Sequence, residues 1–157
     1  APRCRPQPMT TLLLAHNMML RRGVLRHLRE LAALAPVLSQ TPEWLLEATS
    51  AELPPAPIDF ALLDCSGTDT DSFRLLDALH SRLAPRRWLV MCETPDPEFA
   101  RYAAGLGASG CLPVPASPEQ TRAAVALVRA GGQCFPRRAF AMPPPSPIGS
   151  GGSTARG

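Results

Sequence analysis

Short apolar runs alternate with longer segments of helical periodicity along most of the chain. Two of the runs, residues 11–15 and 58–63, are apolar almost without interruption, which is typical of parallel strands covered on both faces. Shorter apolar segments at residues 37–38, 87–92 and 110–112 complete a set of five predicted strands.

The first two segments between these strands have the features of helices. Apolar residues recur every three or four positions from Leu20 to Leu34, and arginines occupy the opposite face. The second helix is predicted to run to Ala48, with Thr41 as N-cap and Pro42 at the first helical position.

The remaining helices are marked by their ends. A third helix is predicted over residues 72–83. A fourth begins at Asp96 as N-cap and ends at Gly107, because glycine readily adopts the left-handed conformation that closes a helix. A fifth begins with the capping box at residues 117–120 and stops at the glycines 131–132.

Strict alternation of five strands and five helices predicts an α/β domain with a parallel sheet and helices on both faces. This domain is expected to span residues 9–136 of the 157. Residues 137–157 are rich first in proline and then in glycine and serine, which is typical of a linker. The linker is expected to be disordered and to lead to a further domain.

Composition narrows the classes of function. The net charge is only +3, and the sixteen basic residues, all arginines, are scattered, so direct nucleic-acid binding is not indicated. No segment reaches the ~20 apolar residues that a membrane span needs. The five cysteines have no C-x-x-C spacing, and Cys65, Cys92 and Cys111 fall in predicted strands or at their ends, which favours a reducing cytoplasm.

Ligands of open parallel sheets bind beyond the carboxyl ends of the strands. This rule selects the residues that directly follow or end the predicted strands as the candidate site. They are His16, Asn17, Asp64, Cys92, Glu93 and Val114.

Five stretches in order, at residues 13–23, 59–64, 105–110, 116–119 and 130–133, resemble the receiver domain of NarL/LuxR-type bacterial response regulators. The resemblance covers about residues 9–136 and implies a flavodoxin-like three-layer fold with strand order 2-1-3-4-5. It also implies that Asp64 is the phosphoacceptor, that the chain forms homodimers, that a sensor kinase is a possible partner, and that DNA is bound only through a C-terminal helix-turn-helix domain.

The departures from that family are more informative than the matches. His16 and Asn17 replace the two carboxylates that hold Mg²⁺, which prefers oxygen ligands. Cys92 replaces the hydroxyl residue after the fourth strand, and Val114 replaces the lysine after the fifth. Two further positions also differ from the family: Cys111 replaces the switch aromatic residue, and Glu93 replaces a small residue.

These departures predict a pseudo-receiver that acts by protein–protein contact, without enzymatic activity and with Mg²⁺ binding lost or weak, because phosphoryl transfer depends on metal and cationic groups. Asp64 is then an ordinary carboxylate left on the scaffold. The first alternative is a working receiver phosphorylated on Asp64, and the second is a binder of a small ligand in the altered pocket. Two dimer faces remain possible. One consists of the first and fifth helices, and the other consists of the fourth helix, the fifth strand and the fifth helix.

Four smaller questions are left open by the sequence. Asp69 and Asp71 could assist a cation, although Asp71 also suits the N-terminus of the third helix. Cys92 and Cys111 could form a redox pair only with a suitable separation and a low-pKa thiolate. His16 could bind a metal, although no second histidine completes a site, and the bond between residues 114 and 115 could be cis.

Overall fold

The computed structural model describes residues 10–31, 36–54, 57–93 and 96–136. Within these residues five parallel strands form one sheet in the order β2-β1-β3-β4-β5, which confirms the predicted topology. The expected linker at residues 137–157 and Cys4 lie outside the described residues. The strands are β1 (Thr10–Leu14), β2 (Val37–Gln40), β3 (Ile58–Asp64), β4 (Arg87–Cys92) and β5 (Gly110–Pro113).

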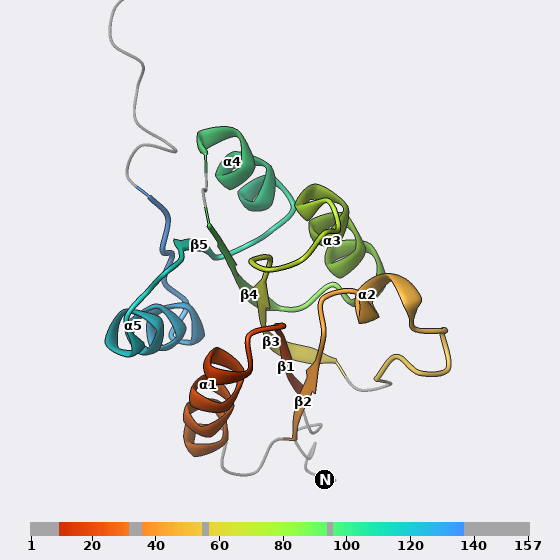
Figure 1. The fold of residues 1–157 in the computed structure, drawn as a ribbon, viewed down its shortest axis with the longest axis horizontal. Helices are drawn as coiled ribbons and strands as arrows, with labels where there is room; N and C mark the ends of the chain where they lie inside the picture. The colour runs from red at the N-terminus through yellow and green to blue at the C-terminus, as the bar shows by residue number, and fades with distance from the viewer. Residues whose placement is uncertain (1–9, 32–35, 55–56, 94–95, 137–157) are drawn as a thin grey trace, which may run out of the picture.

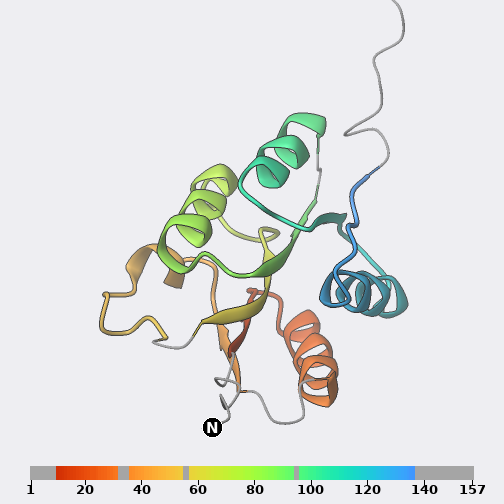
Figure 2. The same ribbon diagram turned by 180° about the vertical axis from the view of Figure 1, so that it is seen from behind.

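Helices cover both faces of the sheet, as Figures 1 and 2 show. One face carries the helices α1 and α5, which lie side by side, and the other carries α2, α3 and α4. No described helix is long and apolar enough to cross a membrane. The helices are α1 (Met18–Leu31), α2 (Trp44–Glu47), α3 (Ser72–Ala78), α4 (Pro97–Gly105) and α5 (Pro118–Arg129).

Alternation along the strands divides the core into two layers, because successive side chains of a strand point to opposite faces. In β3, Phe60 and Leu62 face α1 and α5, whereas Ala61 and Leu63 face α2, α3 and α4. Asp64 is the next residue on the same side of β3 as Phe60 and Leu62. The alternation of side chains along β3 therefore directs Asp64 toward the face of the sheet that α1 and α5 cover.

The predicted helix ends are largely confirmed. Asp96 caps α4 by accepting a hydrogen bond from Phe99 N (2.7 Å), and Gly107 follows the helix with a φ of 106°. The capping box of α5 is present between Ser117 and Gln120, and Asp71 caps α3. These local signals are strong because each satisfies backbone groups that a helix end leaves unpaired.

The second and third helices differ from the predictions in detail. Thr41 does not cap α2: its carbonyl accepts from Trp44 N in a preceding turn, and the helix begins only at Trp44. The third helix extends from Ser72 to Leu83 as predicted, but its last part, Leu79–Leu83, is a π-helical turn closed by Ala84, which has a φ of 43°. The predicted end of the first helix at Leu34 lies outside the described residues.

Candidate functional site

Asp64 ends β3 and is completely buried. Its Oδ1 accepts two hydrogen bonds from Ser66, one from the backbone N (2.9 Å) and one from Oγ (2.7 Å). Its Oδ2 is buried and has no hydrogen-bond partner among the described residues. A carboxylate oxygen in that position is costly unless something donates to it.

The pKa of Asp64 is raised above the ordinary carboxyl range. Burial is the main cause, and the two hydrogen bonds from Ser66 oppose it in part. The negative charge of Glu93 raises the pKa further, whereas His16 lowers it. The environment of Asp64 therefore disfavours the charged form of its carboxyl group.

Asn17 accepts hydrogen bonds from the first turn of α1. Its Oδ1 accepts hydrogen bonds from the backbone N of Met19 (3.0 Å) and of Leu20 (3.1 Å). Its carbonyl accepts the first helical hydrogen bond, from Arg21 N (2.8 Å). Asn17 is thus the N-cap of α1, and its side-chain oxygen is already engaged.

His16 is paired with a residue that sequence reasoning missed. Its Nε2 lies 2.5 Å from Oε2 of Glu43, and the other carboxylate oxygen of Glu43 accepts from Thr68. Although burial raises the pKa of Glu43, the hydrogen bonds from His16 and Thr68 outweigh burial, and the pKa is lowered. Glu43 precedes α2 in the turn after Pro42, so only the folded topology brings it beside His16.

The residues around Asp64 fit Mg²⁺ poorly. Among the described residues, no three His, Cys, Asp or Glu side chains are grouped so that they could hold a metal ion. The oxygen of Asn17 caps α1 and the imidazole of His16 contacts Glu43. Since Mg²⁺ demands several oxygen ligands in near-ideal octahedral geometry, the single unpaired oxygen of Asp64 is a weak starting point.

Val114 lines a cavity of about 360 Å³ that lies next to Asp64, between α1 and α5. The peptide bond between Val114 and Pro115 is cis. Val114 contributes an apolar wall to this cavity, at the position where the resembling family has an ammonium group. Sequence reasoning missed His27 of α1, which also lines this cavity and which gives no local signal beyond its place in a helix.

Cys92 and Cys111 lie on neighbouring strands and are buried thiols outside any disulfide, as is Cys65. A hydrogen bond with Cys92, together with burial, raises the pKa of the Cys111 thiol. Burial also raises the pKa of Cys65 to about 12. The raised pKa values of Cys65 and Cys111 disfavour the thiolate that redox chemistry needs, and all three cysteines pack in the core on the side of α2, α3 and α4.

The other acidic candidates are not brought to Asp64 by hydrogen bonds. Asp71 caps α3 through its contact with Phe73 N (3.2 Å), as the alternative for that residue predicted. Asp69 is an exposed loop residue. Glu93 is exposed and acts on Asp64 through its charge. The site therefore consists of Asp64, Ser66 and the cavity, with the His16–Glu43 pair nearby.

Neither a protein-family model nor a curated protein matches the chain. Solved structures do. A LuxR family DNA-binding response regulator from Silicibacter pomeroyi superposes with a TM-score of 0.60 at 22% identity, over 84% of this chain and 99% of that chain. The isolated receiver domain of RcsB from Salmonella enterica serovar Typhimurium, solved with phosphomimetic BeF₃⁻, gives 0.62 at 15% identity, over 84% and 96%.

The chain has the receiver fold. The chemotaxis response regulator CheY4 of Vibrio cholerae gives a TM-score of 0.57 at 20% identity, over 77% of this chain and 98% of that chain. The structural similarity thus extends to several response regulators. It agrees with the five-stranded parallel sheet of this chain, which has the strand order 2-1-3-4-5. At these identities the likeness establishes the fold, and the side chains at Asp64 carry the argument on function.

Proposed function

We propose that this chain is a pseudo-receiver: a regulatory domain that acts by protein–protein contact and does not depend on phosphorylation of Asp64. The observation that carries the proposal is the surroundings of Asp64. Asn17 caps a helix, His16 is paired with Glu43, and Val114 stands where a cation is needed. Phosphoryl transfer relies on metal and cationic groups to neutralise the phosphoryl oxygens.

The buried carboxyl of Asp64 adds to this argument. Its raised pKa and the negative charge of Glu93 both oppose further negative charge at the same point. A phosphoryl group would bring about two negative charges at neutral pH. In a working receiver the metal and the ammonium group offset that cost, and in this chain an apolar valine side chain lines the pocket instead.

Acetyl phosphate tests the proposal directly. After incubation with acetyl phosphate and Mg²⁺, intact-mass spectrometry of the wild-type chain is expected to show no added phosphoryl group. The matched control is the triple variant His16→Asp, Asn17→Asp and Val114→Lys, which restores the groups of the resembling family and is expected to gain phosphorylation on Asp64. Stoichiometric labelling of the wild-type chain would instead support the alternative, a working aspartyl-phosphate receiver.

We further propose that the domain is a homodimer in a cytoplasmic transcription regulator, with DNA contacted only through a separate C-terminal domain. A solved RcsB structure, of which this chain covers 65%, contains RcsB dimers bound to DNA. Exposed apolar side chains favour α1 and α5 as the dimer face. Met18 and Met19 of α1 and Leu127 of α5 are 53%, 85% and 46% exposed, whereas α4 contributes Tyr102 at 39%.

Charge substitution distinguishes the two candidate dimer faces. Met18→Glu is expected to convert the dimer to monomer in sedimentation velocity, because it buries a charge at the contact. An acidic residue suits the N-terminus of α1, so the variant should stay folded. Tyr102→Glu, on α4, is the control and is expected to leave the dimer intact. Dissociation by Tyr102→Glu alone would assign the α4 face instead.

A further inference from the structure

The cavity beside Asp64 has the size and lining of a site for a small molecule. Its volume of about 360 Å³ lies at the lower end of the range for small-ligand pockets, roughly 300–1,000 Å³. Its walls are largely apolar and come from α1, from β4 and from the segment after β5, represented by Leu20, Val24, Met91, Val114 and Pro115.

Two buried polar atoms belong to residues that line this cavity and have no hydrogen-bond partner in the part of the chain that the structure describes. They are Oδ2 of Asp64, whose residue is fully buried, and Nε2 of His27. Buried polar atoms are nearly always hydrogen-bonded in folded proteins, so two unpaired ones at a single cavity point to a partner that enters it. The carboxylate oxygen of Asp64 requires a hydrogen-bond donor.

A glycine keeps the wall of the cavity open. Gly23 lies within α1 and lines the cavity, and a Cβ atom added there would have nothing within 4 Å. Glycine in a helix interior destabilises the helix relative to alanine, and no close contact requires a glycine at this exposed position. The absence of a side chain at this position leaves room between α1 and the strand ends.

The distribution of charge excludes a phosphate or another compact anion as the occupant of the cavity floor. Asp64 lies there, and Val114 supplies no positive charge. The guanidinium-bearing residue of the lining is Arg122, which is exposed on α5. An anion would therefore meet a carboxyl at depth and a cation only at the outside.

We propose that this cavity binds a small organic molecule with an apolar body and a hydroxyl or amino group. On binding, a shift of the lining side chains uncovers Oδ2 of Asp64, which is covered in this structure, and the polar group of the ligand donates to it. The apolar body packs against Met91, Val24 and Val114, and His27 offers a second polar contact. The exposed residues Asn17 and Arg122 lie at the entrance. This site goes beyond the proposed function and does not depend on it, because neither Mg²⁺ nor phosphate takes part.

The test uses NMR titration of the isotope-labelled chain with five probes, in the absence of Mg²⁺ and of phosphate analogues. Benzyl alcohol, cyclohexylmethanol and benzylamine carry the donor, whereas toluene and methylcyclohexane have similar shapes without it. At least one donor probe is expected to shift the amide signals of Leu20, Val24, Asp64 and Thr121 in a saturable way. The probe without the donor is expected to bind at least tenfold more weakly.

Two glycine variants provide the matched control. Gly23→Leu places a side chain into the cavity and is expected to weaken binding at least tenfold, with the rest of the spectrum unchanged. Gly105→Leu, at the end of α4, also adds a side chain where nothing lies within 4 Å, and it is expected to leave binding unchanged. Binding by the alcohols alone assigns a hydroxyl ligand, and binding by benzylamine alone assigns an amine.

Three results would overturn the proposal. They are no saturable shift with any donor probe, equal affinity for donor and donor-free probes, and equal weakening by both glycine variants. None of them bears on the pseudo-receiver proposal, which fails only if Asp64 accepts a phosphoryl group.

Discussion

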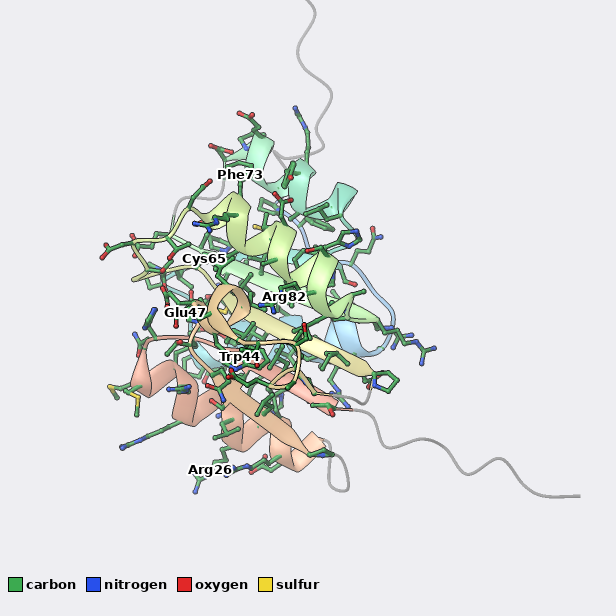
Figure 3. The ribbon with its side chains drawn as sticks, turned by 90° about the vertical axis from the view of Figure 1, so that its right-hand side faces the viewer. Arg26, Trp44, Glu47, Cys65, Phe73 and Arg82 are labelled. Atoms are coloured by element: carbon green, nitrogen blue, oxygen red, sulfur yellow. The ribbon has the colours of Figure 1, made fainter. Side chains whose placement is uncertain are left out.

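The two faces of the sheet differ in how well their buried polar groups are satisfied. On the side of α2, α3 and α4, the guanidinium of Arg82 donates to the carbonyls of Leu45 (2.5 Å) and Ala48, and Phe73 packs edge-to-face on Phe99 and Tyr102. Figure 3 looks onto this side, with Arg82 near α2, the helix that carries Trp44 and Glu47.

The side of α1 and α5 is different. Among the described residues, the buried side-chain polar atoms without a partner belong to His27 of α1, Arg129 of α5 and Asp64, which faces these helices. The same side contains the cavity next to Asp64. The comparison teaches that the buried polar groups of one face are satisfied and stabilise the fold, whereas the other face keeps unsatisfied ones beside a cavity.

The largest effect is expected on the well-satisfied face. Arg82→Ala removes two charged hydrogen bonds to the end of α2 and is expected to lower the free energy of unfolding by roughly 2 kcal/mol in urea denaturation. Arg86→Ala, an exposed arginine nearby, is the control and should change stability by less than about 0.5 kcal/mol. Equal effects of the two variants would contradict the role given to Arg82.

A smaller effect of opposite sign is expected on the other face. Asp64→Asn should raise the free energy of unfolding by about 1 kcal/mol near neutral pH, because a buried carboxylate whose Oδ2 has no donor among the described residues is replaced by a neutral amide. The raised pKa of Asp64 means that the folded chain binds a proton more tightly than the unfolded chain. Wild-type stability therefore rises as the pH falls through the raised pKa, and the advantage of Asn disappears in acid.

Denaturation of both chains across a pH series measures this effect. Asp69→Asn, at an exposed loop position, is the control and should change stability by less than about 0.5 kcal/mol. The contrary result is a difference in free energy of unfolding between wild type and Asp64→Asn that stays constant from neutral to acid pH. It would show that burial does not disfavour the charge of Asp64.

The smallest effect tests the open wall of the cavity. Gly23→Ala should raise the free energy of unfolding by about 0.5–1 kcal/mol, since the added methyl group meets no atom and alanine favours the helix. Gly107→Ala is the matched control and should destabilise the chain, because its φ of 106° suits only glycine. Thermal unfolding of both variants gives the comparison, and a destabilising Gly23→Ala would show that the wall is closed there.

Much of the fold could be predicted from the sequence because its signals are local. Continuous apolar runs gave the strands, and caps such as Asp96 and Ser117 gave the helix starts. The strand order came from the resemblance and is confirmed. The differences at Thr41 and Leu79–Leu83 lie beside tertiary contacts, of Glu43 with His16 and of Arg82 with α2, which are not visible in a local pattern.

The candidate site was predictable only in part. Asp64 was found because it ends an apolar strand, and the ends of parallel strands meet at one edge of the sheet. The partner of His16, the orientation of His27 and the cavity were missed. These features depend on side chains from α1, α5 and the turn before α2 that meet only in the folded chain.

The central claim is that the surroundings of Asp64 cannot hold Mg²⁺ together with a phosphoryl group. The most direct measurement is an NMR titration of the chain with Mg²⁺ and beryllofluoride, a mimic of the phosphoryl group. We expect no saturable shift of the amide signals of Asp64, Ser66 and Val114 at millimolar concentrations. Saturation that also reshapes the signals of β4, β5 and α5 would contradict the claim and show a working receiver.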